Sequence, residues 1–373
     1  MTSPVDASAS VFLRNGVTIH LGDCRGILAS LEPESVHCCV TSPPYWGLRD
    51  YGHEAQLGLE ATPEEYVSKM VEVFRGVRRA LRPDATLWLN LGDTIVDKQL
   101  QGIPWRIAFA LQADGWYLRS EIIWHKPNPM PESVNDRPTK SHEQIFLLAK
   151  APRYYYDAEA IKEDSVDPES INGRRPRHTR KDHEHKVTPG SHDQEFAGNR
   201  SGFLKGKSND PGRTYLTRNR RSVWTIPTKP YSGAHFAVFP PALIEPCILA
   251  GTSEEGCCPA CGAPWERVVE RTPYRPETVA VGDRFVDESR QDKTRKLSGK
   301  EYNDQVSSRT TGWRPTCDCD AGDPIPCTVL DPFLGSGTTA DVAIKNGCRC
   351  IGCELSPEYF ELAKDRFEQR RLF

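Results

Sequence analysis

The sequence contains no apolar segment that approaches the roughly 20 residues a membrane-spanning helix needs. Its start, MTSPVDASAS, also lacks the charged region followed by an apolar stretch that marks a secretory signal peptide. We therefore expect no membrane partner and a cytoplasmic location. A strong charge of either sign is absent too, since the net charge is −3. Any face that binds nucleic acid must therefore be a local one.

The composition leaves room for a large globular fold. With 373 residues, 38% of them hydrophobic and 27% charged, the chain suffices for one α/β domain with insertions or for two domains. Its 13 cysteines do not have the pattern of a secreted disulfide framework. Five of them lie in apolar, strand-like runs, which predicts buried and reduced thiols: Cys38, Cys39, Cys348, Cys350 and Cys353.

The first 150 residues alternate strand-like and helix-like segments. Apolar residues at helical spacing predict a helix that begins after a Thr62 cap and Pro63 and extends to Leu81, and a second helix over 104–113. Short apolar runs predict strands at 17–21, 36–41, 86–91, 122–124 and 144–149. This alternation predicts a mostly parallel sheet with helices on both faces.

The middle of the chain, residues 151–235, has no such periodicity. It is rich in Arg, Lys, His, Gly, Ser and Asn, as in NGRRPRHTRKDHEHK. One interpretation is a solvated insertion. The other is a segment that contacts nucleic acid, with arginines for phosphates and bases and with Tyr215 and Trp224 to provide order. Composition alone supports both interpretations.

The last third contains a second insertion and a closing α/β unit. A short helix over 242–250 precedes the insertion, which occupies 251–327. The closing unit has a strand over 328–330, a glycine-rich turn, a helix, a strand over 349–352 and a final helix capped by Ser356.

The glycine-rich turn, VLDPFLGSGTTADVAI, places an acidic residue and small residues between a strand and a helix. Such a loop exposes backbone N–H groups and lets a ligand approach the main chain. A P-loop would need a Lys after Gly337, where Thr338 stands, and a dinucleotide fingerprint would need a further glycine. The set Asp331, Gly335, Gly337 and Glu354 instead favours S-adenosylmethionine, with Glu354 placed for the ribose hydroxyls.

The motif TSPPYW, Thr41 to Trp46, follows an apolar strand at the other end of the chain. Its two prolines stiffen the backbone, hold Ser42 in an extended conformation and leave carbonyl groups without a competing local N–H. The tetrapeptide SPPY alone is also compatible with an ordinary turn. The glycine-rich loop far along the chain is what makes it informative.

Taken in order, these motifs resemble those of the DNA amino-methyltransferases, in the circularly permuted class usually called beta. In that class (D/N/S)PP(Y/F/W) comes first, a target-recognition region lies in the middle and DPFxGSGTT comes last. This chain has TSPPYW, the basic insertion and DPFLGSGTT in that order. Further matching segments are HLGDC at 20–24, LRPDATLWLN at 81–90, WHKPNPMP at 124–131, SHEQIFLLAK at 141–150 and FPPALIEPCI at 239–248.

The resemblance implies a fold and a division of the chain. The fold is α/β, with the Rossmann-like sheet of S-adenosylmethionine-dependent methyltransferases in circularly permuted order. The division is 1–150 for the catalytic half of the methyltransferase domain, 151–235 for the target-recognition insertion, 236–250 with 328–373 for the cofactor-binding half, and 251–327 for a cysteine-containing insertion.

The resemblance also implies roles for single residues. Ser42 and the carbonyl of Pro43, followed by Pro44, would accept hydrogen bonds from the target amino group, and Tyr45 would stack on the target base. The cofactor-binding residues would be Asp331, Phe333, Gly335, Ser336, Gly337 and Thr338 at the methionine and ribose part, Glu354 at the ribose hydroxyls, and Asp23 and Cys24 near the adenine.

These residue types suit direct methyl transfer to the exocyclic amine of a base flipped out of double-stranded DNA. Two acceptors on the amine hydrogens favour a pyramidal nitrogen and stabilise the positive charge that develops on it. In this class a serine before PPY is associated mainly with cytosine N4 and an aspartate mainly with adenine N6. We therefore expect cytosine N4, with adenine N6 as the alternative. An RNA or protein methyltransferase and a non-catalytic DNA-binding zinc protein are more distant alternatives.

The second insertion contains two cysteine pairs with the spacing of a small metal site. CPACG at 258–262 resembles a zinc knuckle, and CDC at 317–319 departs from the usual CxxC. Cys257 and Cys327 are spare candidates, and two unrelated pairs of reduced thiols are the alternative. We expect one structural zinc ion held by Cys258, Cys261, Cys317 and Cys319. A cognate restriction endonuclease and a second copy of the chain are candidate partners besides DNA.

Overall fold

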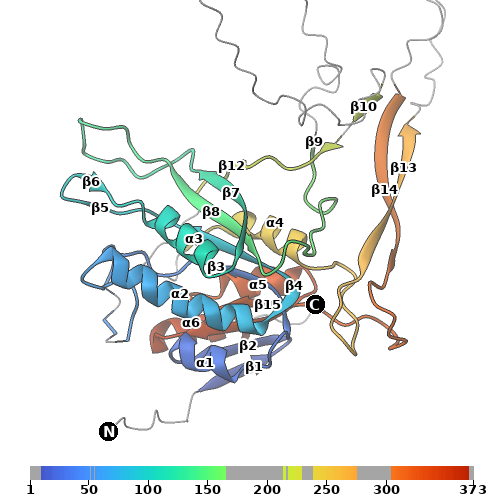
Figure 1. The fold of residues 1–373 in the computed structure, drawn as a ribbon, viewed down its shortest axis with the longest axis horizontal. Helices are drawn as coiled ribbons and strands as arrows, with labels where there is room; N and C mark the ends of the chain where they lie inside the picture. The colour runs from blue at the N-terminus through green and yellow to red at the C-terminus, as the bar shows by residue number, and fades with distance from the viewer. Residues whose placement is uncertain are drawn as a thin grey trace, which may run out of the picture. The chain divides into compact units, whose positions relative to one another are not determined.

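In the computed structural model a mixed nine-stranded sheet forms the core of the first of two compact units, with the strand order β1-β2-β16-β15-β3-β4-β8-β7-β12 (Figure 1). Its strands are β1 (Val11–Arg14), β2 (Val17–Leu21), β3 (Val36–Thr41), β4 (Leu81–Leu91), β7 (Tyr117–His125), β8 (His142–Ala149), β12 (Val223–Thr225), β15 (Thr328–Asp331) and β16 (Arg349–Glu354). Neighbouring strands are parallel from β2 to β4. Strand β8 is antiparallel to both β4 and β7. The carboxyl ends of β2, β16, β15, β3 and β4 therefore lie at one edge of the sheet.

The structure describes residues 10–50, 52–53, 55–164, 213–215, 217–228, 238–274 and 304–368. The chain divides into two compact units. The first contains Met1–Ile161, Asn219–Val268 and Gly312–Phe373, and the second contains Lys162–Arg218 and Val269–Thr311. Among the described residues, no helix combines the length and the apolar character needed to cross a membrane.

Helices cover both faces of the main sheet (Figure 1). One face carries α1 (Cys24–Ser30), α2 (Pro63–Ala80) and α3 (Ile103–Ala113), and the other carries α4 (Pro241–Gly251), α5 (Thr338–Lys345) and α6 (Pro357–Glu368). Adjacent residues on a strand point to opposite faces, so Cys39 packs under the first set of helices and Cys38 under the second. This two-sided burial explains the continuous apolar runs in the sequence. All 13 cysteines are free thiols, and the five in the strand-like runs are buried, as predicted.

The helix signals in the sequence are confirmed, with boundaries shifted by one residue at the end of α2, the start of α3 and both ends of α4. The Thr62 side chain accepts a hydrogen bond from the N–H of Glu65 at 3.2 Å, and Ser356 Oγ accepts one from the N–H of Tyr359 at 3.4 Å. Helix α2 ends at Ala80 rather than at Leu81. Leu81 is already the first residue of β4, because it pairs with Val36 of β3.

Residues 219–228 belong to the first unit and contribute strand β12 to the main sheet, although the sequence suggested that they are part of the basic insertion. Strand β12 runs parallel to β7. Trp224 is only 5% exposed and lies 6.4 Å from Trp88 between ring centroids. Trp224 is therefore a core residue of the main sheet, and whether it orders a nucleic-acid-binding segment stays a prediction. The apolar run of β12 is short and follows several arginines, so the sequence did not predict a strand there. Most of the insertion, 165–212 and 229–237, lies outside the described residues.

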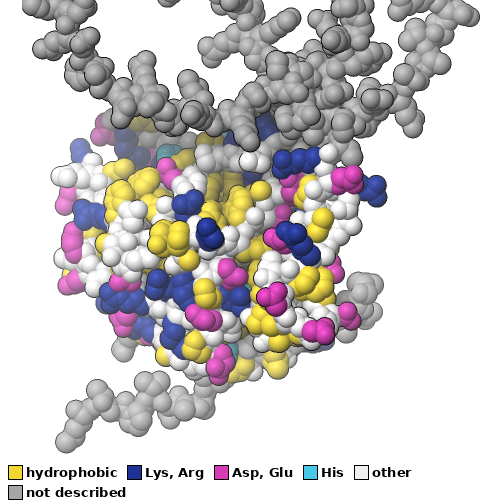
Figure 2. All heavy atoms as spheres, turned by 45° about the vertical axis from the view of Figure 1, so that its right-hand side comes forward, with side chains coloured by type: hydrophobic (Ala, Val, Ile, Leu, Met, Phe, Trp, Pro, Cys, Tyr) yellow, Lys and Arg dark blue, Asp and Glu magenta, His cyan; other side chains and the backbone are white. Residues whose placement is uncertain are grey.

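Two small sheets involve the second unit. Strand β10 (Arg213–Tyr215) runs parallel to β14 (Asp304–Arg314), which neighbours β13 (Glu266–Tyr274). Strand β9 (Glu163–Asp164) is antiparallel to β11 (Thr217–Arg218). A hairpin of β5 (Ile95–Val96) and β6 (Gln99–Leu100) belongs to the first unit. Figure 2 shows basic and acidic side chains interspersed over one face, in line with the net charge of −3.

Candidate active site

The TSPPYW loop and the glycine-rich loop meet at the carboxyl edge of the sheet. They follow β3 and β15, which are adjacent parallel strands paired at Cys38 with Val329 and at Cys39 with Leu330. A buried hydrogen bond of 2.6 Å from Thr41 Oγ1 to Asp331 Oδ1 joins the starts of the two loops. Two motifs at opposite ends of the sequence therefore form one site.

Asp331 lies beneath this site rather than on its surface. Its side chain is 0% exposed, and its carboxylate accepts hydrogen bonds from the hydroxyls of Thr41 and Thr339 and from the N–H of Phe333. Burial raises the pKa of this carboxyl to about 6. We expected Asp331 to line the cofactor site, but its oxygens are committed to the protein. It is therefore a positioning residue for both loops.

The glycine-rich loop has the backbone shape that its glycines predict. Gly335 and Gly337 have φ values of +55° and +81°, in the left-handed region that disfavours side chains. The space beside the Cα of Gly335 is open. The hydroxyl of Ser336 is buried and has no hydrogen-bond partner among the described residues. An open backbone with an unsatisfied hydroxyl is suited to a polar ligand. Thr338 is buried at the start of α5, and Phe333 is half-buried.

Glu354 holds the loop in place from the end of β16. Its Oε2 accepts a hydrogen bond of 2.7 Å from the N–H of Gly335, and its Oε1 accepts one of 2.8 Å from the N–H of Ser356. A carboxylate has about four acceptor positions, so these hydrogen bonds leave acceptor capacity for a ligand hydroxyl. Burial raises the pKa of Glu354.

Asp23 and Cys24 follow β2, which pairs with β16 next to Glu354. The N–H of Gly22 donates to the backbone carbonyl of Glu354 at 2.8 Å. Burial opposes ionisation of Asp23, but the hydrogen bonds and charge of Arg25 outweigh it and lower the pKa. Burial raises the pKa of the Cys24 thiol to about 12, so that this thiol stays protonated. The predicted cofactor residues thus lie at the ends of three neighbouring strands, β2, β16 and β15.

The TSPPYW loop is anchored on both sides of its prolines. Tyr66 donates a hydrogen bond of 2.6 Å to the carbonyl of Pro44, and the indole N–H of Trp46 donates one of 2.9 Å to the carbonyl of Glu60. No described residue donates a hydrogen bond to the carbonyl of Pro43. Among the described residues, a hydrogen bond therefore engages the carbonyl of Pro44 but not that of Pro43.

Tyr45 is held by its ring and by its hydroxyl. A Cβ added to Gly92 would lie 2.4 Å from Cε2 of Tyr45, so one face of the ring rests on the Gly92 backbone. The hydroxyl donates to Glu143 Oε2 at 2.8 Å and receives a hydrogen bond from Asn90 Nδ2 at 2.9 Å. Burial, then the Glu143 charge, raises the pKa of Tyr45, which keeps the phenol protonated. Ser42 Oγ lies 3.3 Å from the same hydroxyl.

The sequence did not identify the polar residues around Tyr45. Lys126 forms an ion pair with Glu143, and Asn90 Nδ2 lies 3.0 Å from Glu143 Oε2. These residues come from β4, the end of β7 and the start of β8. Asn90, Lys126 and Glu143 lie in the segments LWLN, WHKP and SHEQ, which the sequence had already matched to the family. That match was the one signal in the sequence that could have pointed to them. Their convergence depends on the antiparallel pairing of β8, which motif spacing does not reveal.

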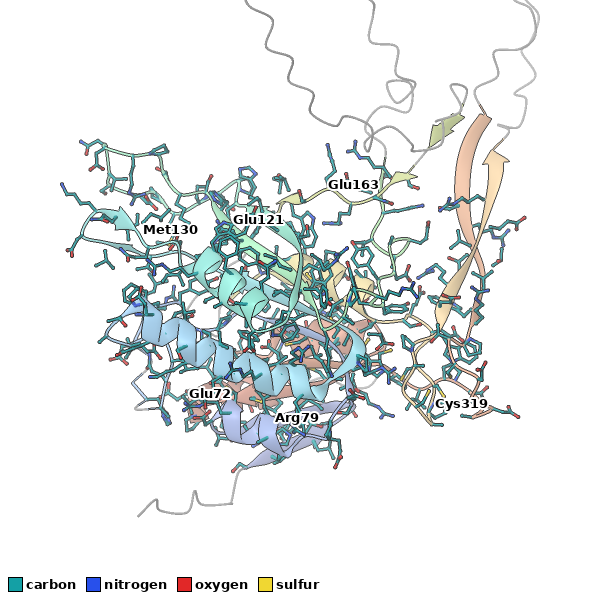
Figure 3. All side chains as sticks on the ribbon, in the orientation of Figure 1. Glu72, Arg79, Glu121, Met130, Glu163 and Cys319 are labelled. Carbon is teal, nitrogen blue, oxygen red and sulfur yellow. The ribbon has the colours of Figure 1, made fainter. Side chains whose placement is uncertain are left out.

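The cysteines of the second insertion converge as predicted. The sulfurs of Cys258, Cys261, Cys317 and Cys319 all lie within 4.8 Å of one another, and Figure 3 shows Cys319 among the loops at the base of β13 and β14. The backbone N–H of Cys261 is the main cause that lowers the pKa of the Cys258 thiol. Such a set of four thiols is the donor set of a closed zinc site.

A second group, formed by His37, Cys257 and Cys327, has a different character. The imidazole Nε2 of His37 lies 2.9 Å from the carbonyl of Gly262. Its Nδ1 lies 3.0 Å from the N–H of Thr328 and therefore accepts that hydrogen bond. Both ring nitrogens are engaged by the backbone, so this group is a hydrogen-bonded cluster rather than a metal site.

Comparison with known proteins agrees with this geometry. A family model described as DNA methylase, covering the N6 and N4 enzymes, matches residues 36–258 and 327–365. The Type II methyltransferase M.SmaI of Serratia marcescens is 36% identical over 382 residues, which cover 95% of this chain and 91% of that protein. M.Cfr9I of Citrobacter freundii is 34% identical and covers 95% of this chain and 88% of its own.

A solved structure shares the fold at lower sequence similarity. The PvuII DNA methyltransferase, described as cytosine-N4-specific, superimposes with a TM-score of 0.54 and 15% sequence identity. The match covers 95% of this chain and 86% of that one.

Proposed function

This chain belongs to the N6/N4 family of DNA methylases, and on that basis we propose that it transfers a methyl group from S-adenosylmethionine to the N4 amino group of cytosine in double-stranded DNA. The observation that carries the proposal is the meeting of the TSPPYW and glycine-rich loops on adjacent strands, joined by Thr41 and Asp331. A methyl donor on one loop and a target amine on the other would then lie side by side.

S-adenosylmethionine supplies an activated methyl group when it is bound. The residues proposed to hold it suit a polar ligand, because the Ser336 hydroxyl lacks a partner among the described residues and the backbone at Gly335 is open. Glu354 would accept the ribose hydroxyls. Asp23 and Cys24 would lie near the adenine, and Phe333, Gly337 and Thr338 would complete the wall. Asp331 would act from below by fixing the loop.

The catalytic contribution of the chain is to bind and orient the target amine. Ser42 Oγ and the free carbonyl of Pro43 would accept its two hydrogens, and both stabilise positive charge on the nitrogen more in the transition state than in the ground state. Tyr45 has one ring face on Gly92. Its other face would stack on the flipped base and offset part of the unstacking cost, a few kcal/mol. No covalent enzyme intermediate is required.

Cytosine N4 rather than adenine N6 is proposed because a serine precedes the prolines in TSPPYW. PvuII methyltransferase, which shares the fold, is described as cytosine-N4-specific. An adenine N6 enzyme would use the same site and mechanism, and is the alternative.

We further propose how the chain is organised around this site. Its motif order, TSPPYW before DPFLGSGTT, is that of the permuted class. The basic insertion within 151–235 would read the DNA sequence. One zinc ion, held by Cys258, Cys261, Cys317 and Cys319, would be structural and take no part in methyl transfer. A Type II restriction endonuclease is the proposed companion, since the relatives are Type II methyltransferases. A second copy of the chain is another candidate partner, and the proposed location is the cytoplasm.

Transfer of labelled methyl from S-adenosylmethionine to duplex DNA, followed by digestion and mass spectrometry of the nucleosides, tests the function. We expect N4-methylcytosine. N6-methyladenine would keep the mechanism and overturn the base assignment. Label on RNA or protein alone would overturn the DNA proposal.

The Ser42→Ala variant tests the catalytic role. Loss of one acceptor from the charged nitrogen should lower kcat by about 100-fold, while DNA and cofactor binding persist. Unchanged kcat would exclude Ser42 from the chemistry. Asp50→Asn, on an exposed residue after the loop, is the matched control and should keep full activity.

A further inference from the structure

The two feet of the second insertion, defined here as residues 256–266 and 314–327, are held together on both sides of the cysteine cluster. On one side Cys257 and Ile325 exchange two backbone hydrogen bonds of 2.8 and 2.9 Å. A Cβ on Gly256 would lie 2.3 Å from the Ile325 carbonyl oxygen, so that only glycine permits this approach. On the other side Arg314 forms an ion pair with Glu266.

Each foot contributes two thiols to the cluster between these contacts. All four sulfurs lie within 4.8 Å of one another. In a tetrahedral site with Zn–S bonds of about 2.3 Å, the sulfurs are about 3.8 Å apart. Only a small adjustment of the side chains is therefore needed, and a bound zinc ion would cross-link the two feet.

The first foot also docks on the main sheet. Arg82 of β4 donates to the carbonyl of Cys261, and His37 of β3 donates from Nε2 to the carbonyl of Gly262. Gly262 has a φ of +69°, in the left-handed region that favours glycine. His37 lies at the start of β3, four residues or about 13 Å from Thr41. The docking contact is thus at the opposite end of the strand from the TSPPYW loop.

The feet continue into a ribbon that carries the basic insertion. Strand β13 begins shortly after Cys261, and β14 ends shortly before Cys317. Strand β10 of the basic insertion pairs with β14, where Arg213 lies opposite Asp304 and Tyr215 opposite Val306. The match to the methylase family stops at residue 258 and resumes at 327. The insertion is therefore an addition to the shared catalytic fold, connected to the segment proposed to read DNA.

We propose that zinc bound by Cys258, Cys261, Cys317 and Cys319 locks the feet of the insertion onto β3 and β4, and that DNA binding, but not S-adenosylmethionine binding, depends on this lock. The inference rests on the proposed zinc site and DNA substrate. Its physical basis is that the cofactor residues lie at the carboxyl ends of β2, β16 and β15, whereas the lock acts at the start of β3.

The test compares the full-length protein with a double variant, Cys317→Ser with Cys319→Ser, and with Asp318→Ser as the matched control in the same loop. Zinc content is measured by mass spectrometry of the metal, and S-adenosylmethionine binding by calorimetry. Hydrogen exchange is followed in 258–274 and 304–320. DNA affinity is measured with a duplex that the unaltered protein methylates.

We expect one zinc per chain in the unaltered protein and in Asp318→Ser, and none in the double variant. Loss of zinc should speed hydrogen exchange in the ribbon by about tenfold, weaken duplex binding by about tenfold and leave cofactor affinity unchanged. A zinc-free unaltered protein, disulfides between the four cysteines, full DNA affinity without zinc, or an equal loss of cofactor binding would each overturn the lock. If the unaltered protein methylates no DNA, the proposed function fails, while zinc content and ribbon exchange still report on the site.

Discussion

Glu143 reaches the hydroxyl of Tyr45 across 98 residues of sequence. Because Gly92 supports one face of the Tyr45 ring and Glu143 holds its hydroxyl, the ring has little freedom to rotate. Lys126 balances the carboxylate charge. A stacking surface that is fixed before the base arrives avoids an ordering cost at the moment of binding. Glu143 is therefore a positioning residue that acts through Tyr45.

The Glu143→Gln substitution should lower kcat by about tenfold, or about 1.4 kcal/mol, with the KM for S-adenosylmethionine unchanged. The neutral amide is a weaker acceptor for the Tyr45 hydroxyl and leaves Lys126 without its charge partner. A double-mutant cycle with Tyr45→Phe measures whether Glu143 acts through that hydroxyl. The double variant should be no slower than the slower single variant, and fully additive losses would contradict the positioning role.

Asp331 predicts a dependence of stability on pH. Its pKa of about 6 is above the ordinary value of 3.8, so the folded state binds this proton more tightly than the unfolded state. The resulting stability is fully present below pH 3.8 and is lost as the pH rises through about 6. Between pH 5 and 7 the loss amounts to about 1 kcal/mol.

Asp331→Asn cannot ionise and should not show this loss. The free energy of unfolding of the wild type, measured in urea, should therefore fall relative to that of the variant by about 1 kcal/mol from pH 5 to pH 7. A constant difference between the two proteins over this range would mean that Asp331 is not the titrating group.

At the scale of elements, β12 changes where the basic insertion begins and ends. Trp124 donates from its indole N–H to the carbonyl of Ile226 at 2.8 Å, and Ile123 N–H donates to Ser222 at 2.8 Å. Asp157, which precedes the insertion in the sequence, is buried and forms an ion pair of 2.9 Å with Arg267. Residues 151–161 and 219–228 thus belong to the first unit with the main sheet, whereas 162–218 belongs to the second unit together with 269–311.

This boundary predicts the result of exchanging the insertion with that of a relative that methylates another sequence. A chimera over 162–218 should fold and methylate the relative's site. A chimera over 151–235 also removes Trp224, and truncation of a buried tryptophan costs about 3–5 kcal/mol, so its melting temperature should fall. Sequencing of methylated DNA identifies the site, and an unchanged site in the first chimera would refute target recognition by this segment.

At the scale of the whole molecule, the two ends of the parallel strands have different tasks. The carboxyl ends of β2, β16, β15 and β3 carry the candidate cofactor and catalytic residues, as in open α/β sheets generally. The amino ends of β3 and β4 receive the cysteine insertion through His37 and Arg82. Cys261 and Gly262 of the insertion therefore contact the sheet at the end opposite to the catalytic loops.

The sequence by itself determined the family, which the relatives confirm, along with most helices, most strands of the main sheet and the buried thiols. These features depend on local periodicity, caps and short motifs, which are legible within a few residues. Only the tertiary structure decided that Asp331 lies beneath the site, that Glu143 and Asn90 hold Tyr45, and that Trp224 belongs to the core. Each of these depends on which strands are neighbours. Strand order is set by packing between segments as far apart in the sequence as Val17 and Cys350, which no local pattern encodes.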